Sequence, residues 1–159
     1  MSAGKFRRGG ITPNQVNICI HEIQNGEVSG EVYSRYSTEP WKFQNLVQLV
    51  ASMESFFNKV SFPQSAVQLR GSAWDSTGKL PDIEKGPYLE REFLLEKRGE
   101  CLTFLVSVRY RQNATWQGNL LWIEGNQAME FKSALELMMI INKAIRAHNS
   151  NKKTYKDRW

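Results

Sequence analysis

Residues that build metal centres, disulfide frameworks and catalytic clusters are scarce in this chain. Its 159 residues include two cysteines, two histidines and three aspartates. Cys19 and Cys101 are too few for a disulfide scaffold or a four-ligand zinc site, and neither His21 nor His148 lies at a short ligand spacing from a cysteine. Walker, dinucleotide-binding, zinc-protease and nucleophile-elbow motifs are absent too. The sequence therefore favours a protein without metal, cofactor or catalytic activity.

Long apolar runs are also missing. None approaches the roughly 18 residues that a membrane span needs. The basic residues Lys5, Arg7 and Arg8 are not followed by the apolar stretch of a secretory signal. We therefore expect no membrane partner and a cytoplasmic location. Hydrophobic residues make up 41% of the chain and charged residues 23%, values typical of a globular protein with a single domain.

The net charge of +5 is concentrated at the two ends of the chain. Residues 1–12 carry +3, and residues 149–159, which include Lys152 and Lys153, also carry +3. Residues 13–148 hold 14 basic and 15 acidic residues. We expect a single domain over 13–148 between a basic N-terminus and a basic C-terminal tail. Such tails attract phosphate without recognising sequence, or are simply solvated ends.

The spacing of hydrophobic residues predicts an α+β domain. Val16, Ile18 and Ile20 alternate with polar residues, as in a strand, and the Asn-Gly pair at 25–26 predicts a hairpin turn into a second strand over 28–36. The remaining expected elements are a helix from about Pro40 to Val60, a strand over 66–70, a loop around Trp74, strands over 88–97, 102–111 and 116–124, and a helix over 128–148. Together they predict an antiparallel sheet with two amphipathic helices on one side.

The two ends of this domain align on each other at an offset of 88. Residues 16–60 match 104–148 without a gap, and 61–103 join them. Five of the 45 aligned pairs are identical, including Gly30 with Gly118, and the hydrophobic pattern agrees better than the identities do. This pattern favours an internal duplication of a strand-turn-strand-helix unit, although two unrelated amphipathic segments can also match in this way.

The second helix differs from the first on its outer side. Where the first helix has Ala51 and a serine, the second has Met139 and Ile140, so the second helix is apolar nearly all round. Met139 and Ile140, with Trp74 in the long loop, are candidates for binding a protein partner or a second copy of the chain. Burial beneath residues 61–87 is the alternative.

A turn at residues 113–114 would place four arginine and tryptophan side chains on one face of the second hairpin. These are Arg109, Arg111, Trp116 and Trp122, with Arg111 directly opposite Trp116. Bases stack on indole rings, worth about 1–3 kcal/mol each, while guanidinium groups hold phosphates. The pattern favours binding of single-stranded DNA or RNA. The alternative is that both tryptophans are core residues, and a slip of one residue would exchange the two faces.

Three short segments together resemble a sequence pattern that small uncharacterised bacterial proteins share. They are Ala114–Gly118, Trp122–Glu124 and Phe131–Leu137. In topology, residues 66–148, with four expected strands followed by a helix, are similar to a PUR or Whirly repeat. Members of those families bind single-stranded nucleic acid on a curved sheet and pair through their helices. The resemblance implies a nucleic-acid partner and a homodimer.

Three functional hypotheses follow. The leading one is a non-enzymatic module that binds single-stranded nucleic acid through Arg109, Arg111, Trp116 and Trp122, assisted by the basic tails. The second is a protein-interaction or inhibitor module, dimeric through the second helix. The third is a small-ligand-binding protein with a pocket between the two repeated halves.

Overall fold

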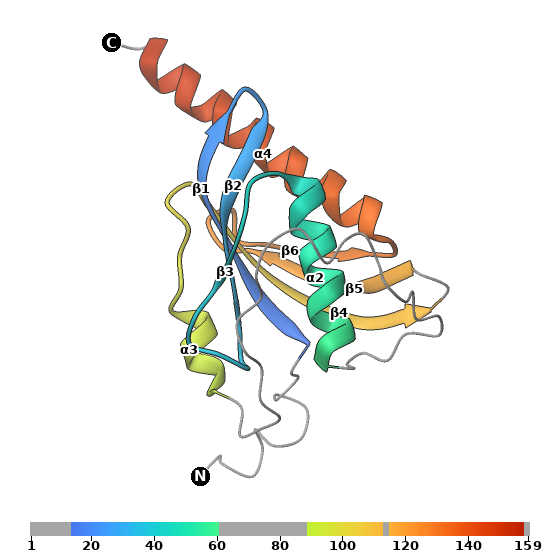
Figure 1. Cartoon of the computed structure of the whole chain (residues 1–159). Coiled ribbons are helices and arrows are strands. Elements are labelled where there is room, and N and C mark those ends of the chain that lie inside the picture. The colour runs from blue at the N-terminus through green and yellow to red at the C-terminus, as the bar shows by residue number, and fades with distance from the viewer. Residues whose placement is uncertain (1–13, 61–88, 113–114, 158–159) are drawn as a thin grey trace.

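The computed structural model describes residues 14–60, 89–112 and 115–157. They form a six-stranded antiparallel sheet and three helices, which confirms the α+β class (Figure 1). In chain order the elements are β1 (Gln15–Gln24), β2 (Glu27–Ser34), β3 (Trp41–Phe43), α2 (Leu46–Val60), α3 (Arg91–Leu95), β4 (Leu102–Gln112), β5 (Thr115–Trp122), β6 (Gln127–Phe131) and α4 (Ala134–Asp157). The strand order across the sheet is β3-β2-β1-β4-β5-β6.

The two halves of the sheet contain the same elements in the same order. The expected Asn-Gly turn is confirmed, because Asn25 and Gly26 both have positive φ and join β1 to β2. In the second half, β4 pairs with β5 in the same way, and each half ends in a helix. The matching order agrees with the offset of 88, while a common origin by duplication stays a prediction.

Each hairpin contains a β-bulge at the same aligned position. The register shifts between Ile20 and Glu22 in the first hairpin. It shifts between Val108 and Tyr110, 88 residues later, in the second. Gly30 and Gly118 lie opposite these bulges. A Cβ on Gly30 would lie 1.9 Å from the main-chain oxygen of Cys19, and one on Gly118 would lie 1.9 Å from that of Ser107. Only glycine allows the strands to approach so closely.

The helices α2 and α4 pack on one face of the sheet (Figure 1). Their first turns are capped in the same way, because Asn45 Oδ1 accepts from the Gln48 N–H at 2.8 Å and Ser133 Oγ accepts from the Glu136 N–H at 3.0 Å. The core between helices and sheet consists of apolar side chains from both halves, among them Val16, Ile18, Ile20, Val32, Phe43, Leu49, Met53, Phe56, Phe57, Phe104, Val106, Val108, Leu120, Phe131, Leu137 and Ile141.

The predicted starts of both long helices are wrong. Residues 41–43 and 127–131 are edge strands, so the helices begin only at Leu46 and Ala134. Phe43 and Phe131, which fit the helical spacing, instead pair with the bulge glycines of the neighbouring strands and are buried. A large ring covers the surface that a glycine leaves open, and this packing outweighs the local helical pattern.

The predicted strand over 88–97 is also wrong, because its described part contains the short helix α3. Asn17 of β1 donates from Nδ2 to the main-chain oxygens of Leu94 and Lys97, at 2.6 and 3.1 Å. Asn17 alternates with the core residues Val16 and Ile18, so α3 lies on the sheet face opposite α2 and α4. This packing leaves Leu94 fully buried.

The C-terminal end of the chain differs from the expected tail. The last helix continues to Asp157 instead of ending near residue 148, so Lys152 and Lys153 lie within α4. In Figure 1 this helix extends beyond the tip of the β1–β2 hairpin. The basic N-terminus, the expected strand over 66–70 and the loop around Trp74 lie outside the described residues. Among the described helices, none is long and apolar enough to cross a membrane.

Candidate functional site

The four side chains expected on one open face do not share such a face. Arg111 pairs with Trp116 as predicted, but the bulge at Arg109 places Val108, not Arg109, opposite Gly118. Between the bulge and the start of β4, each β5 residue therefore lies opposite the β4 residue that was expected on the other face of the sheet. Trp116 and Trp122 therefore face the helices, and the predicted arrangement is wrong.

Arg111 and Trp116 form a buried polar cluster with α2. Both side chains are only 2% exposed. Glu54 accepts from Arg111 Nη1 at 3.1 Å and from Trp116 Nε1 at 2.8 Å, and Asn58 Oδ1 accepts from Arg111 Nη1 at 2.8 Å. The Trp116 ring also meets the Phe57 ring edge to face at 5.7 Å. These contacts tie the β4–β5 hairpin to the C-terminal half of α2 and leave no indole face open for a base.

Burial lowers the pKa of the Arg111 guanidinium, and the neighbouring Glu54 carboxylate partly opposes that shift. The pair therefore resembles a structural ion pair inside the protein more than a phosphate-binding group. Asn58 completes the cluster from the next turn of the helix. The role of Glu54 could not be predicted from the sequence, because its carboxylate lies on a different element, 57 residues from Arg111.

The other two residues of the expected face are separated from this cluster. Arg109 is exposed at the bulge, 4.0 Å from the Glu130 carboxylate. Trp122 is partly buried against the core, and a Cβ on Gly125 would lie 2.3 Å from its ring. On the outer face of this half of the sheet, the exposed aromatic side chain among the described residues is Tyr110.

Two large hydrophobic side chains of α4, Leu135 and Met139, are exposed. Met139 is 60% exposed, while Ile140, expected beside it, is partly buried against the core. Leu135, which the sequence analysis did not select, is 63% exposed and lies one helical turn before Met139. The i, i+4 spacing was the signal that would have found it. Trp74, the third residue expected here, lies outside the described residues.

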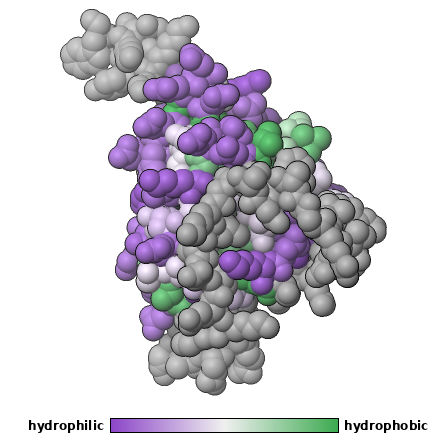
Figure 2. Space-filling view, in the orientation of Figure 1, coloured by the Kyte–Doolittle hydropathy of each residue, from purple (hydrophilic) through white to green (hydrophobic). Residues whose placement is uncertain are grey.

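In the first half, Ala51 aligns with Met139 but is buried, so the prediction that it lies on the outer side of its helix is wrong. Trp41 of β3 donates from Nε1 to Ser52 Oγ of α2 at 2.8 Å, and the adjacent Ala51 is 5% exposed. Residue 129 is the aligned position in the second half, where a partly buried methionine stands in place of this tryptophan. Figure 2 shows hydrophobic surface near the top of the molecule, where α4 passes beside the start of α2.

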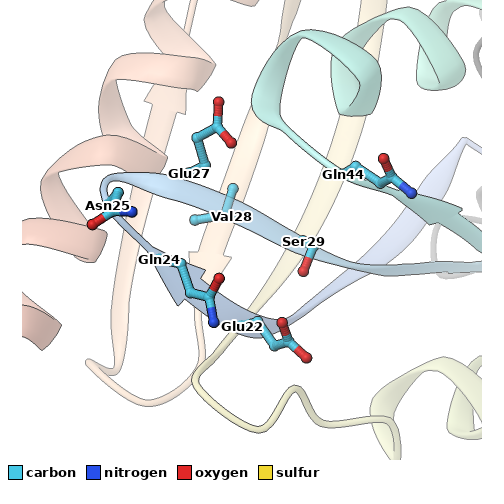
Figure 3. Close-up of a pocket in the computed structure, with 7 residues that line it drawn as sticks. All are labelled: Glu22, Gln24, Asn25, Glu27, Val28, Ser29 and Gln44. Carbon is cyan, nitrogen blue, oxygen red and sulfur yellow. The ribbon is translucent and has the colours of Figure 1, made fainter.

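A polar cavity of about 430 Å³ lies beside the tip of the β1–β2 hairpin (Figure 3). It is lined by Glu22, Gln24, Asn25, Glu27, Val28, Ser29 and Gln44. The lining comes from the first half of the chain and its connection to α2, so this cavity is not the pocket between halves that the third hypothesis expected. Within the described ranges, no group of three or more histidine, cysteine or carboxylate side chains is placed to hold a metal ion.

Comparison with known proteins adds no functional assignment. No family model, curated protein or solved structure matches the chain. The resemblance to PUR and Whirly repeats stays a prediction, and in the described part of residues 66–148 three strands, not four, precede the last helix. The candidate site therefore depends on the geometry of the chain alone.

Proposed function

We propose that this chain is a non-enzymatic interaction module that assembles as a homodimer through α4. The observation that carries the proposal is the pair of exposed side chains Leu135 and Met139, one turn apart on the same side of the helix. Large apolar side chains exposed together favour burial against a partner. Fully burying each contributes about 1.5–3 kcal/mol.

The charges around this pair favour a second copy as the partner. In a two-fold interface the same surface of both copies is in contact. A residue on one side of the axis therefore contacts a residue of the partner that lies on the other side. In an antiparallel helix pair centred on Met139, Glu136 lies three residues before the centre and Lys143 four residues after it. Each carboxylate would then lie close to the ammonium group of the other copy, twice per dimer.

The expected affinity is modest. Four buried side chains per dimer supply roughly 6–12 kcal/mol before the cost of association, which is itself several kcal/mol. The proposal therefore predicts a dissociation constant in the micromolar range or weaker. It places the dimer in the cytoplasm, where thiols stay reduced; neither Cys19 nor Cys101 forms a disulfide.

Nucleic-acid binding through a stacking surface is not part of this proposal. The guanidinium of Arg111 and the indole of Trp116 are already paired with Glu54. Basic residues at the chain ends remain, but charge of this kind binds any polyanion and identifies none.

Sedimentation equilibrium of the full chain, from about 1 to 300 µM, tests the proposal. Leu135→Lys and Met139→Lys should each weaken dimerisation at least tenfold. Tyr110→Lys is the matched control, because Tyr110 is 57% exposed on β4, on the sheet face away from α4, and should leave dimerisation unchanged. Glu136→Lys should weaken the dimer, and the double variant Glu136→Lys/Lys143→Glu should restore it. A wild-type chain that stays monomeric throughout this range overturns the proposal.

A further inference from the structure

Arg35 is a buried arginine that forms no ion pair with a carboxylate among the described residues. It follows the last residue of β2 and is 3% exposed. Its main-chain oxygen accepts from the Leu89 N–H at 2.8 Å, and its Nε donates to the Leu89 oxygen at 2.7 Å. These two bonds join Arg35 to Leu89, and the second fixes the position of the side chain. The Nη1 atom is buried and has no hydrogen-bond partner.

A second guanidinium group lies close to the first. Arg91, two residues after Leu89, also has a buried donor without a partner, its Nε atom. Burial lowers the pKa of Arg35, the nearby charge of Arg91 lowers it further, and Glu92 and Glu90 act in the opposite direction. The two arginines therefore repel each other across a partly desolvated space.

Arg111 has the carboxylate partner that Arg35 lacks among the described residues. Arg111 is equally buried, but the Glu54 carboxylate lies 3.1 Å from its Nη1. Within the described ranges, the ion pairs of the molecule are His21–Glu31, Arg109–Glu130 and Arg111–Glu54, and Arg35 is in none of them. Burying an unpaired charge is costly, whereas a buried charge with an opposite charge beside it is tolerated.

We propose that Arg35 and Arg91 form a binding site for a small oxyanion, a carboxylate or a phosphate. Two unpaired donors on different residues suit a ligand with at least two acceptor oxygens, and guanidinium groups bind both anions through such pairs. Glu90 and Glu92 add negative charge nearby, which favours a small anion over a polyanion. Arg91 is partly exposed, so the site reaches the surface at the start of α3. In Figure 1, α3 lies away from the N-terminal half of α4, so this site is independent of the proposed dimer.

Thermal unfolding in sodium phosphate, sodium acetate and sodium chloride at matched ionic strength tests the site. Phosphate or acetate, at about four times its dissociation constant, should raise the Tm of the full chain about 2–4 °C above the value in chloride. The anion that gives the larger rise identifies the preferred ligand. Arg35→Met and Arg91→Met should each remove the rise. Arg98→Met is the matched control, because that exposed guanidinium donates only to main-chain oxygens of Leu95 and Lys97, and it should keep the rise.

A second measurement on the wild-type chain covers the case in which Arg35→Met does not fold. The Nε–Hε signals of Arg35 and Arg91 in a nitrogen–proton NMR spectrum should shift together on titration with the effective anion, while that of Arg98 stays in place. The proposal is overturned if the Tm is equal in all three salts up to 100 mM. It is also overturned if the rise persists in Arg91→Met.

Discussion

Asn17 on β1 lies directly opposite Leu105 on β4, and these two residues are themselves 88 positions apart. For the pairs from Gln15–Ser107 to Cys19–Thr103, adding 88 to the β1 residue and subtracting 88 from the β4 residue returns a pair of the same set. Val16 opposite Val106 becomes Phe104 opposite Ile18, for example. The register of the central strand pair is therefore symmetric about Asn17 and Leu105. This arrangement is what a two-fold axis through the middle of the sheet would produce.

The symmetry predicts that Gly30 and Gly118 tolerate substitution equally badly. An alanine Cβ at either position would lie 1.9 Å from a main-chain oxygen of the neighbouring strand. The strands must separate to admit it, so Gly30→Ala and Gly118→Ala should each lower the free energy of unfolding by more than about 3 kcal/mol. Urea unfolding followed by circular dichroism measures both.

Gly26→Ala is the control for these two variants. Gly26 has a φ of +81° but nothing within 4 Å of a built Cβ. Its substitution should therefore cost only about 1 kcal/mol, from backbone strain without a clash. Equal losses at all three glycines would show that the bulges do not hold the strands this close.

The capping residues of the two long helices provide a second symmetric pair. Asn45→Ala and Ser133→Ala each remove an oxygen that accepts from the first turn of a helix. We expect each to cost about 1 kcal/mol of unfolding free energy. Ser133→Thr keeps a hydroxyl acceptor and should be nearly neutral. A loss at one helix and none at the other would contradict equivalent capping.

The sequence predicted those parts of the fold that depend on local patterns. Alternation at Val16, Ile18 and Ile20 identified β1, and the Asn-Gly pair identified its hairpin. The offset of 88 aligned Gly30 with Gly118, but their close approach to the neighbouring strand is visible only in the structure.

What the sequence did not predict depends on contacts between distant segments. Phe43 fits both a helix and a short edge strand, and pairing with β2 decides between them. The bulge at Arg109 has no local signal, yet it reverses the side-chain alternation along β4, so that Arg111 and Trp116 face inward while Arg109 is exposed. Asn17 stabilises α3 from 77 residues away, so the spacing of apolar residues near Leu94 could not distinguish helix from strand.

The ion pair between the buried Arg111 and the partly exposed Glu54 gives a third prediction. Glu54→Leu removes the carboxylate beside a buried guanidinium and the acceptor of the Trp116 N–H, so it should cost about 3–5 kcal/mol. The double variant Glu54→Leu/Arg111→Met removes both charges and should recover a large part of this loss. A double-mutant cycle by urea unfolding measures the coupling, expected at about 1–3 kcal/mol.

The exposed carboxylate of Glu39 provides the control for this cycle. Glu39→Gln should change the unfolding free energy by less than about 0.5 kcal/mol. If the effects of Glu54→Leu and Arg111→Met simply add, the two groups do not stabilise each other, and the ion pair contributes only as packing.

The fourth prediction concerns the thiol of Cys19, which is fully buried. Burial, with smaller contributions from Glu31 and Glu124, raises its pKa from 9.0 to about 12. At pH 8 the reactive thiolate is therefore about a thousandfold rarer than in an ordinary cysteine. In a Cys101→Ser background, iodoacetamide should modify the native chain at least a hundredfold more slowly than the urea-unfolded chain. Equal rates would contradict this.

The same pKa shift makes stability depend on pH in a defined direction. Between pH 9 and 12 the folded chain keeps the Cys19 proton while the unfolded chain loses it, so the unfolded state binds fewer protons and stability falls as pH rises. Below about pH 9 this contribution is constant. Cys19→Ala removes the titrating group, so the stability difference between the variant and the wild type should shift in favour of the variant from pH 8 to pH 10.5. Urea unfolding at both values measures it, and a pH-independent difference would mean that the native thiol ionises as readily as the unfolded one.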